Sequence, residues 1–168
     1  MIKCQYENGN KVSLRHVTVD GIIFNKGKIL LNLRGKFNNK PILESGKWGL
    51  IGGFIDRDET VSEAFKREAY EEAGCVIDNI RLLRIKDTPN RPKEDRQNIS
   101  FVLIADLISI DKSVVTEEVR ELKWFDLDKI PNRSQIAFDH GDDISLFREY
   151  INNKGNIETI NRFSAKIL

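Results

Sequence analysis

Three glutamates in the segment from Thr60 to Ala73 lie on the apolar side of a predicted helix, where charged residues are not expected. The segment has a helical pattern, and at ~100° per residue Glu68 and Glu72 project about 20° either side of the centre of its apolar arc. Glu71 flanks the same arc, whereas Arg67 is expected to project away from it. A charged helix face is usually just solvated, but carboxylates on the core side must be paired, protonated or bound to metal. A single Arg67 cannot neutralise three acids, so a divalent cation is the better partner.

The spacing of these carboxylates indicates the chemistry. Residues at i, i+3 and i+4 of a helix converge on one spot, as Glu68, Glu71 and Glu72 should. Oxygen-only ligands favour Mg²⁺, with Mn²⁺ as an alternative, over zinc. Magnesium accepts phosphate oxygens beside carboxylates and lowers the pKa of water. A free carboxylate could then deprotonate that water, so the pattern predicts hydrolysis of a phosphate-bearing substrate.

The same residues belong to a longer motif that resembles the Nudix box. The motif reads glycine, five residues, Glu, seven residues, Arg-Glu-apolar, any residue, Glu-Glu, any residue, Gly-apolar. All of its specified positions are present: Gly53, Glu59, Arg67-Glu68-Ala69, Glu71-Glu72, Gly74 and Cys75. Looser likeness extends over most of the chain. One departure is Ile51, where many relatives have a proline before the paired glycines.

The resemblance implies a role for each matching position. Glu68, Glu71 and Glu72 would bind the catalytic metals, with Glu71 and Glu72 also counted as catalytic. Arg67 and Glu59 would pair with each other or with Glu68 and hold the helix in place. Gly53 would lie where the loop backbone approaches the metal, a place that a side chain would obstruct.

The substrate is indicated less directly. Pro89 lies 15 residues beyond Gly74, a placement that resembles the ADP-ribose pyrophosphatase subgroup. That likeness implies cleavage of ADP-ribose to AMP and ribose 5-phosphate. The residues assigned to substrate binding are Arg34, Arg91 and Arg96. Two alternatives stay open: a pyrophosphatase that removes (d)NTPs, and a catalytically silent ADP-ribose sensor.

Other residues have weaker claims to the site. The general base outside the box is assigned to Glu118, with Glu94 and Glu117 as alternatives. An adenine could stack on Phe37, Trp48 or Phe54, although packing is the more frequent role of such residues. Both histidines, His16 and His140, are expected to be structural because neither has metal-ligand spacing.

The elements that must position these residues form an α/β pattern. The Asn25-Lys-Gly-Lys turn between two apolar runs predicts a hairpin. The expected strands are 17–24, 29–33, 75–85, 99–107 and 122–125, the helices are 60–73 and 142–151, and 35–47 is a loop. The near-continuous apolar run at 99–107 predicts a central strand covered on both faces. A mixed β-sheet sandwiched between helices follows, as a single domain over residues 1–168 with an irregular N-terminal extension (1–13) and a C-terminal tail (154–168).

The composition of the chain limits the classes of partner and location that are expected. The 168 residues carry 27 Lys+Arg against 26 Asp+Glu, a formal charge of +1, so no basic surface for nucleic acid is expected. No apolar run is long enough to span a membrane. Two cysteines, Cys4 and Cys75, suggest neither a disulfide scaffold nor a zinc site, and we expect a reduced, cytoplasmic protein. Apolar residues in the 154–168 tail could pack on a second copy, which leaves a homodimer open.

Overall fold

A six-stranded mixed sheet forms the centre of the protein in the computed structural model, which describes residues 1–89, 97–113 and 116–153. The strand order is β10-β4-β3-β9-β8, and β7 pairs with β4 outside this path. The central pair β3–β9 is parallel, whereas β8–β9, β3–β4 and β4–β10 are antiparallel. The strands of this sheet are β3 (Val17–Asn25), β4 (Lys28–Arg34), β7 (Trp48–Gly49), β8 (Cys75–Lys86), β9 (Ile99–Ile110) and β10 (Val119–Asp126).

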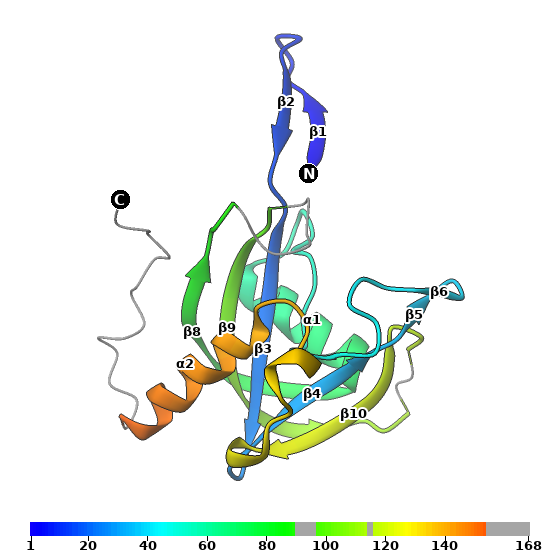
Figure 1. Cartoon of the computed structure of the whole chain (residues 1–168). Coiled ribbons are helices and arrows are strands. Elements are labelled where there is room, and N and C mark those ends of the chain that lie inside the picture. Colours follow the sequence, from blue (N-terminus) through cyan, green and yellow to red (C-terminus); the bar gives the residue numbers. More distant parts are fainter. Residues whose placement is uncertain (90–96, 114–115, 154–168) are drawn as a thin grey trace.

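One helix packs on each face of the sheet (Figure 1). Helix α1 (Val61–Ala73) buries Ala64, Phe65 and Ala69 against one face. Helix α2 (His140–Asn152) buries Ile144 and Phe147 against the other. The predicted α/β/α sandwich is therefore confirmed. Two short 3-10 helices, η1 (Leu127–Lys129) and η2 (Arg133–Gln135), lead from β10 into α2.

The central strand β9 contributes to both cores because its side chains alternate between the two faces. Leu103 and Ala105 lie in the cluster under α1, and Val102 and Ile104 lie in the cluster under α2. The prediction of a strand covered on both faces is confirmed. The strand runs further than expected, to Ile110.

Local signals in the sequence set the ends of α1. Thr60 is the N-cap: its Oγ1 accepts the Glu63 N–H at 3.2 Å, and Glu63 Oε2 accepts the Thr60 N–H at 2.8 Å. Gly74 ends the helix in the left-handed conformation, with φ 62°, which costs glycine little. Both ends of this helix agree with the sequence prediction.

The first two strands depart from the prediction. Residues 1–13 were expected to be irregular, but β1 (Ile2–Gln5) and β2 (Lys11–Leu14) form an antiparallel hairpin that projects from the body of the protein (Figure 1). The 35–47 loop likewise contains a short hairpin of β5 (Lys36–Phe37) and β6 (Lys40–Pro41). The strands of these hairpins have only two to four residues each, too short a run for hydrophobic periodicity to reveal them. Among the described residues, no helix is long and apolar enough to cross a membrane.

Candidate active site

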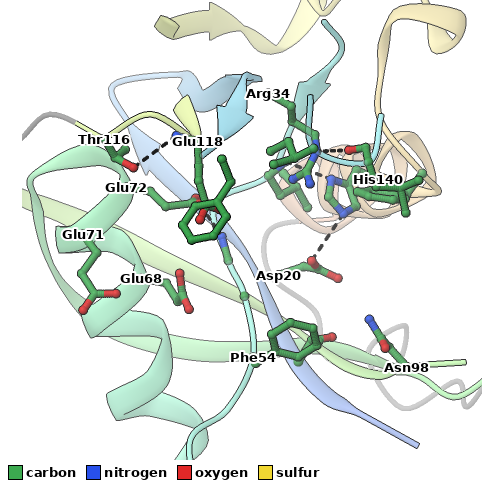
Figure 2. A pocket seen from close by; sticks show the side chains of 18 residues that line it. Asp20, Arg34, Phe54, Glu68, Glu71, Glu72, Asn98, Thr116, Glu118 and His140 are labelled. Atoms are coloured by element: carbon green, nitrogen blue, oxygen red, sulfur yellow. Dashed lines mark hydrogen bonds and ion pairs between the residues drawn. The ribbon is translucent and has the colours of Figure 1, made fainter. Parts of the chain in front are cut away.

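The site lies where β3 and β4 separate. These strands pair only at Phe24–Ile29 and Asn25–Lys28, next to their turn. Further along, the segment from Ile51 to Ile55 takes the place of β4: the N–H groups of Val19 and Gly21 donate to Gly53 and Ile51 carbonyls at 2.9 and 2.7 Å. A cavity of about 550 Å³ opens there (Figure 2).

Residues from both faces of the sheet line this cavity. They come from β3, β4, the 50–54 segment, α1, the 35–47 loop, the residue before β9, the turn before β10 and the start of α2. The lining comprises Thr18, Asp20, Arg34, Phe37, Ile42, Leu43, Leu50, Gly52, Gly53, Phe54, Glu68, Glu71, Glu72, Asn98, Thr116, Glu118, Phe138 and His140.

Glu72 is the most buried of the three helix glutamates. Its Oε2 accepts hydrogen bonds from Asn32 Nδ2 at 3.0 Å and from the Gly52 N–H at 3.3 Å. Burial, reinforced by the nearby charge of Glu68, raises the pKa of Glu72 to about 8. Without a cation, this carboxyl is therefore protonated over much of the neutral range.

Glu68 lies one turn earlier on α1, against the backbone of Gly53. Burial raises the pKa of Glu68, although Arg67 opposes the shift. A Cβ atom added at Gly53 would lie 2.3 Å from Glu68 Oε1, closer than any side chain can approach. A side chain here would force the Glu68 carboxylate to move, because the loop backbone approaches that carboxylate directly.

Arg67 does not project away from the carboxylates, so that expectation is wrong. Its guanidinium forms a two-point pair with Glu59, through Nε to Oε2 at 3.0 Å and Nη2 to Oε1 at 2.7 Å. Nη1 donates to Glu68 Oε1 at 2.8 Å and Glu71 Oε2 at 3.1 Å, and Nη2 donates to the Phe54 carbonyl at 2.9 Å. The long side chain folds back along the helix, which a projection of Cα positions cannot reveal. These bonds lower the pKa of Glu59 and raise that of Arg67.

The donor set suits a divalent cation, but the carboxylates are not drawn together around one. Within the described part of the chain, no group of three or more His, Cys, Asp or Glu side chains is placed to enclose a metal ion. Instead Glu68 and Glu71 turn to Arg67, and Glu72 turns to Asn32. All three nevertheless line one cavity, and burial raises the pKa of Glu68 and of Glu72, with neighbouring carboxylates adding to the rise. Such a set fits a cation that only oxygen ligands hold.

Some of the remaining assigned residues line the cavity, and others do not or lie outside the described part of the chain. Arg34 lines the cavity, donates through Nε to the Leu43 carbonyl at 2.8 Å and lies 5.0 Å from the centre of the Phe138 ring. Glu118 lines the cavity as well, whereas Glu117 is not among the lining residues. The other assigned residues lie outside the described part of the chain: Arg91, Arg96 and Glu94.

The three aromatic candidates also differ in whether they line the cavity. Phe37 and Phe54 line the cavity. Trp48 does not; it packs edge-on against Phe125, with ring centres 4.9 Å apart. Of these three candidates, Phe37 and Phe54 are therefore placed to contact a bound base.

Sequence reasoning missed the polar residues on the α2 side of the cavity. His140 was expected to be merely structural, yet it lines the cavity: its Nδ1 accepts the Leu50 N–H at 3.0 Å, and its Nε2 lies 3.3 Å from Asp20 Oδ1. A usable signal was present, because Asp20 and Ser100 interrupt otherwise apolar strands. A polar residue in a buried strand needs a partner.

The site and the fold agree with what known proteins show. The model of the family described as "NUDIX domain" matches residues 14–147, which include α1 and every wall of the cavity. The chain therefore belongs to the Nudix hydrolase family. Enzymes of this family generally use divalent metals.

Relatives of the chain act on more than one kind of nucleotide. An ADP-ribose pyrophosphatase from Methanocaldococcus jannaschii is 38% identical over 124 residues, covering 74% of this chain and 68% of the relative. An oxidized purine nucleoside triphosphate hydrolase from Danio rerio is 26% identical, covering 70% of each chain. Among solved structures, a MutT NUDIX hydrolase from Burkholderia pseudomallei has a TM-score of 0.64 at 28% identity, covering 80% of this chain and 98% of that one.

Proposed function

We propose that this chain hydrolyses the diphosphate bond of ADP-ribose, taking up one water and releasing AMP and ribose 5-phosphate, with Mg²⁺ or Mn²⁺ bound at α1. The observation that carries the proposal is the cavity wall itself, which Glu68, Glu71 and Glu72 line together and where the bare backbone of Gly53 lies against Glu68. The 38% identical relative from M. jannaschii, which bears the name ADP-ribose pyrophosphatase, supports this choice of substrate.

The glutamates of α1 would hold the cation. Bound there, the cation supplies charge neutralisation on the diphosphate and makes the attacking water more acidic. Glu71 is the residue free to adjust, because 57% of its side chain is exposed and one exposed hydrogen bond ties it to Arg67. Arg67 and Glu59 are positioning residues that fix α1 to the 54–59 loop.

Glu118 is the proposed general base. Glu118 lines the cavity, whereas Glu117 does not, and Glu94 lies outside the described part of the chain. The charge of Glu118 contributes to the raised pKa of Glu68, so the two carboxylates are close enough to interact. A carboxylate that lines the cavity from outside the helix can take a proton from water while the α1 glutamates hold the cation.

Arg34 would bind the diphosphate. It is the only Lys or Arg among the described lining residues, which also include five carboxylates: Asp20, Glu68, Glu71, Glu72 and Glu118. A guanidinium can donate two parallel hydrogen bonds to a phosphate. This excess of acid also disfavours a triphosphate, whose additional charge must be accommodated in the same cavity.

The substrate and the metal can be tested together. Purified protein is assayed with ADP-ribose, with other nucleoside diphosphate sugars and with an oxidised purine triphosphate, in Mg²⁺, in Mn²⁺ and in excess chelator. We expect ADP-ribose to be the best substrate, with activity only when metal is present. Glu71→Gln should lower kcat by roughly 10²–10⁴, whereas the matched control Glu149→Gln, an exposed glutamate on α2, should not.

Two results would replace the proposal. Preference for the oxidised triphosphate would assign the activity named for the D. rerio relative. Binding of ADP-ribose without turnover in any metal would make the chain a sensor.

A further inference from the structure

A buried hydroxyl on the β3 wall of the cavity lacks a hydrogen-bond partner. Thr18 is 6% exposed, and within the described residues its Oγ1 has no partner. The residue lines the same cavity as the α1 glutamates, but it comes from β3. An unpaired buried hydroxyl destabilises the free protein, so a bound group that pairs with it would recover that loss.

Asp20 lies on the same face of β3, two residues further along, and is held rigidly. Ser100 Oγ donates to its Oδ2, and Lys86 Nζ lies 3.4 Å from the same oxygen. His140 Nε2 lies 3.3 Å from Oδ1. Because His140 Nδ1 accepts the Leu50 N–H, the ring proton belongs on Nε2, facing Asp20. In Figure 2, Asp20, His140 and Asn98 stand across the cavity from Glu68 and Glu71.

The positive charge of Lys86, which contacts Asp20, is already balanced by other carboxylates. Lys86 is 3% exposed and also contacts Asp139 Oδ1 at 2.9 Å and Asp143 Oδ2 at 2.7 Å. Its ammonium therefore gives little attraction for an anion in the cavity. A carboxylate with 13% of its side chain exposed presents negative charge there instead, which repels phosphate and accepts N–H or O–H donors.

We propose that Thr18 and Asp20 form a specificity subsite for the neutral, hydrogen-bond-donating end of the substrate. The inference rests on the proposed function, and it assigns the phosphates to the glutamate and arginine side of the cavity. At the two ends of ADP-ribose, such donors are the exocyclic amine of adenine and the hydroxyls of the terminal ribose.

Thr18→Val gives the sharpest test because it removes the hydroxyl and keeps the shape. With ADP-ribose, Thr18→Val should lower kcat/KM roughly 5- to 30-fold, while the ligand-free melting temperature stays constant or rises. Thr18→Ser, which keeps the hydroxyl, should retain kcat/KM near wild type. Equal kcat/KM in Thr18→Val and wild type overturns the proposal, and so does a loss in both variants accompanied by a lower melting temperature.

Calorimetric titration of the products identifies the group that is bound. Asp20→Asn and Thr18→Val are titrated with AMP, IMP, ribose 5-phosphate and pyrophosphate; Asp78→Asn, an exposed aspartate on β8, is the matched control. Weaker binding of AMP but not of IMP identifies the exocyclic amine, and weaker binding of ribose 5-phosphate identifies the terminal sugar. A change confined to pyrophosphate, or no change with any ligand, overturns the subsite. Wild type that binds AMP but does not split ADP-ribose would refute the proposed function separately.

Discussion

Replacing Glu72 by Gln should stabilise the metal-free protein at alkaline pH. The Glu72 carboxyl has a pKa raised to about 8 by burial and by Glu68, against an ordinary value of 4.5. The folded state therefore holds a proton that the unfolded state releases above pH 4.5, and stability falls as pH rises from about 4.5 to 8. A neutral amide of the same shape lacks this loss.

The size of the pKa shift of Glu72 determines how much stability the substitution can restore. A rise from 4.5 to about 8 corresponds to at most about 5 kcal/mol of lost stability at pH 8. Asn32 and the Gly52 N–H both donate to Oε2; the amide oxygen of Gln can accept both bonds, but it is a weaker acceptor than a carboxylate. We expect a net gain of about 2 kcal/mol for Glu72→Gln, equivalent to a melting temperature roughly 4–8 °C higher.

Thermal unfolding of both proteins in chelator at pH 5 and pH 8.5, and again with saturating Mg²⁺, measures this effect. At pH 5 the two should melt together, and at pH 8.5 the variant should melt higher. Added Mg²⁺ should raise the melting temperature of wild type more than that of Glu72→Gln, because binding to the folded state stabilises it. A variant that melts lower at pH 8.5 in chelator, or a Mg²⁺ effect of equal size in both proteins, would refute the reasoning.

Three further substitutions test the surroundings of the site. Gly53→Ala places a methyl group 2.3 Å from Glu68 Oε1, so kcat should fall roughly 10²-fold or more, with a smaller change in urea stability. Arg67→Ala removes the hydrogen bonds that Arg67 donates to Glu59 and Glu68, and should lower the free energy of unfolding in urea by roughly 2–3 kcal/mol. A variant as stable as wild type would rule out the positioning role of Arg67. Lys86→Met removes the ammonium that faces Asp139 and Asp143 and should cost roughly 3–5 kcal/mol by the same measurement, whereas a neutral result would show that Arg84 and water compensate these carboxylates.

The parts of the fold that local signals specify could be predicted from the sequence. Thr60 and Gly74 set the ends of α1 because a cap depends on residues a few positions away. The β3–β4 turn follows from Lys26 and Gly27, which adopt φ 48° and 81° as a two-residue turn requires. Glu68 and Glu72 face the cavity as the helical projection indicated.

Residues brought together over long distances could not be found in this way. Asp20 and His140 are far apart in the chain, and they meet only because α2 packs on β3 and β9. Arg67 was misplaced because a helical projection follows the backbone and not the reach of a long side chain. The strands of the projecting β1–β2 hairpin do alternate, with Ile2 opposite Leu14 and Cys4 opposite Val12, but each has only four residues, the shortest run over which alternation can identify a strand.

A competition assay tests the central claim most directly. Equal concentrations of ADP-ribose and an oxidised purine deoxynucleoside triphosphate are mixed with the wild-type protein in Mg²⁺, and the early products are separated by chromatography. The product ratio then equals the ratio of the two kcat/KM values, whatever fraction of the protein is active. We expect AMP and ribose 5-phosphate to exceed the nucleoside monophosphate of the competitor by roughly tenfold or more, with neither product formed in chelator. Predominance of the competitor's monophosphate and pyrophosphate, or turnover of ADP-ribose without metal, would contradict the account.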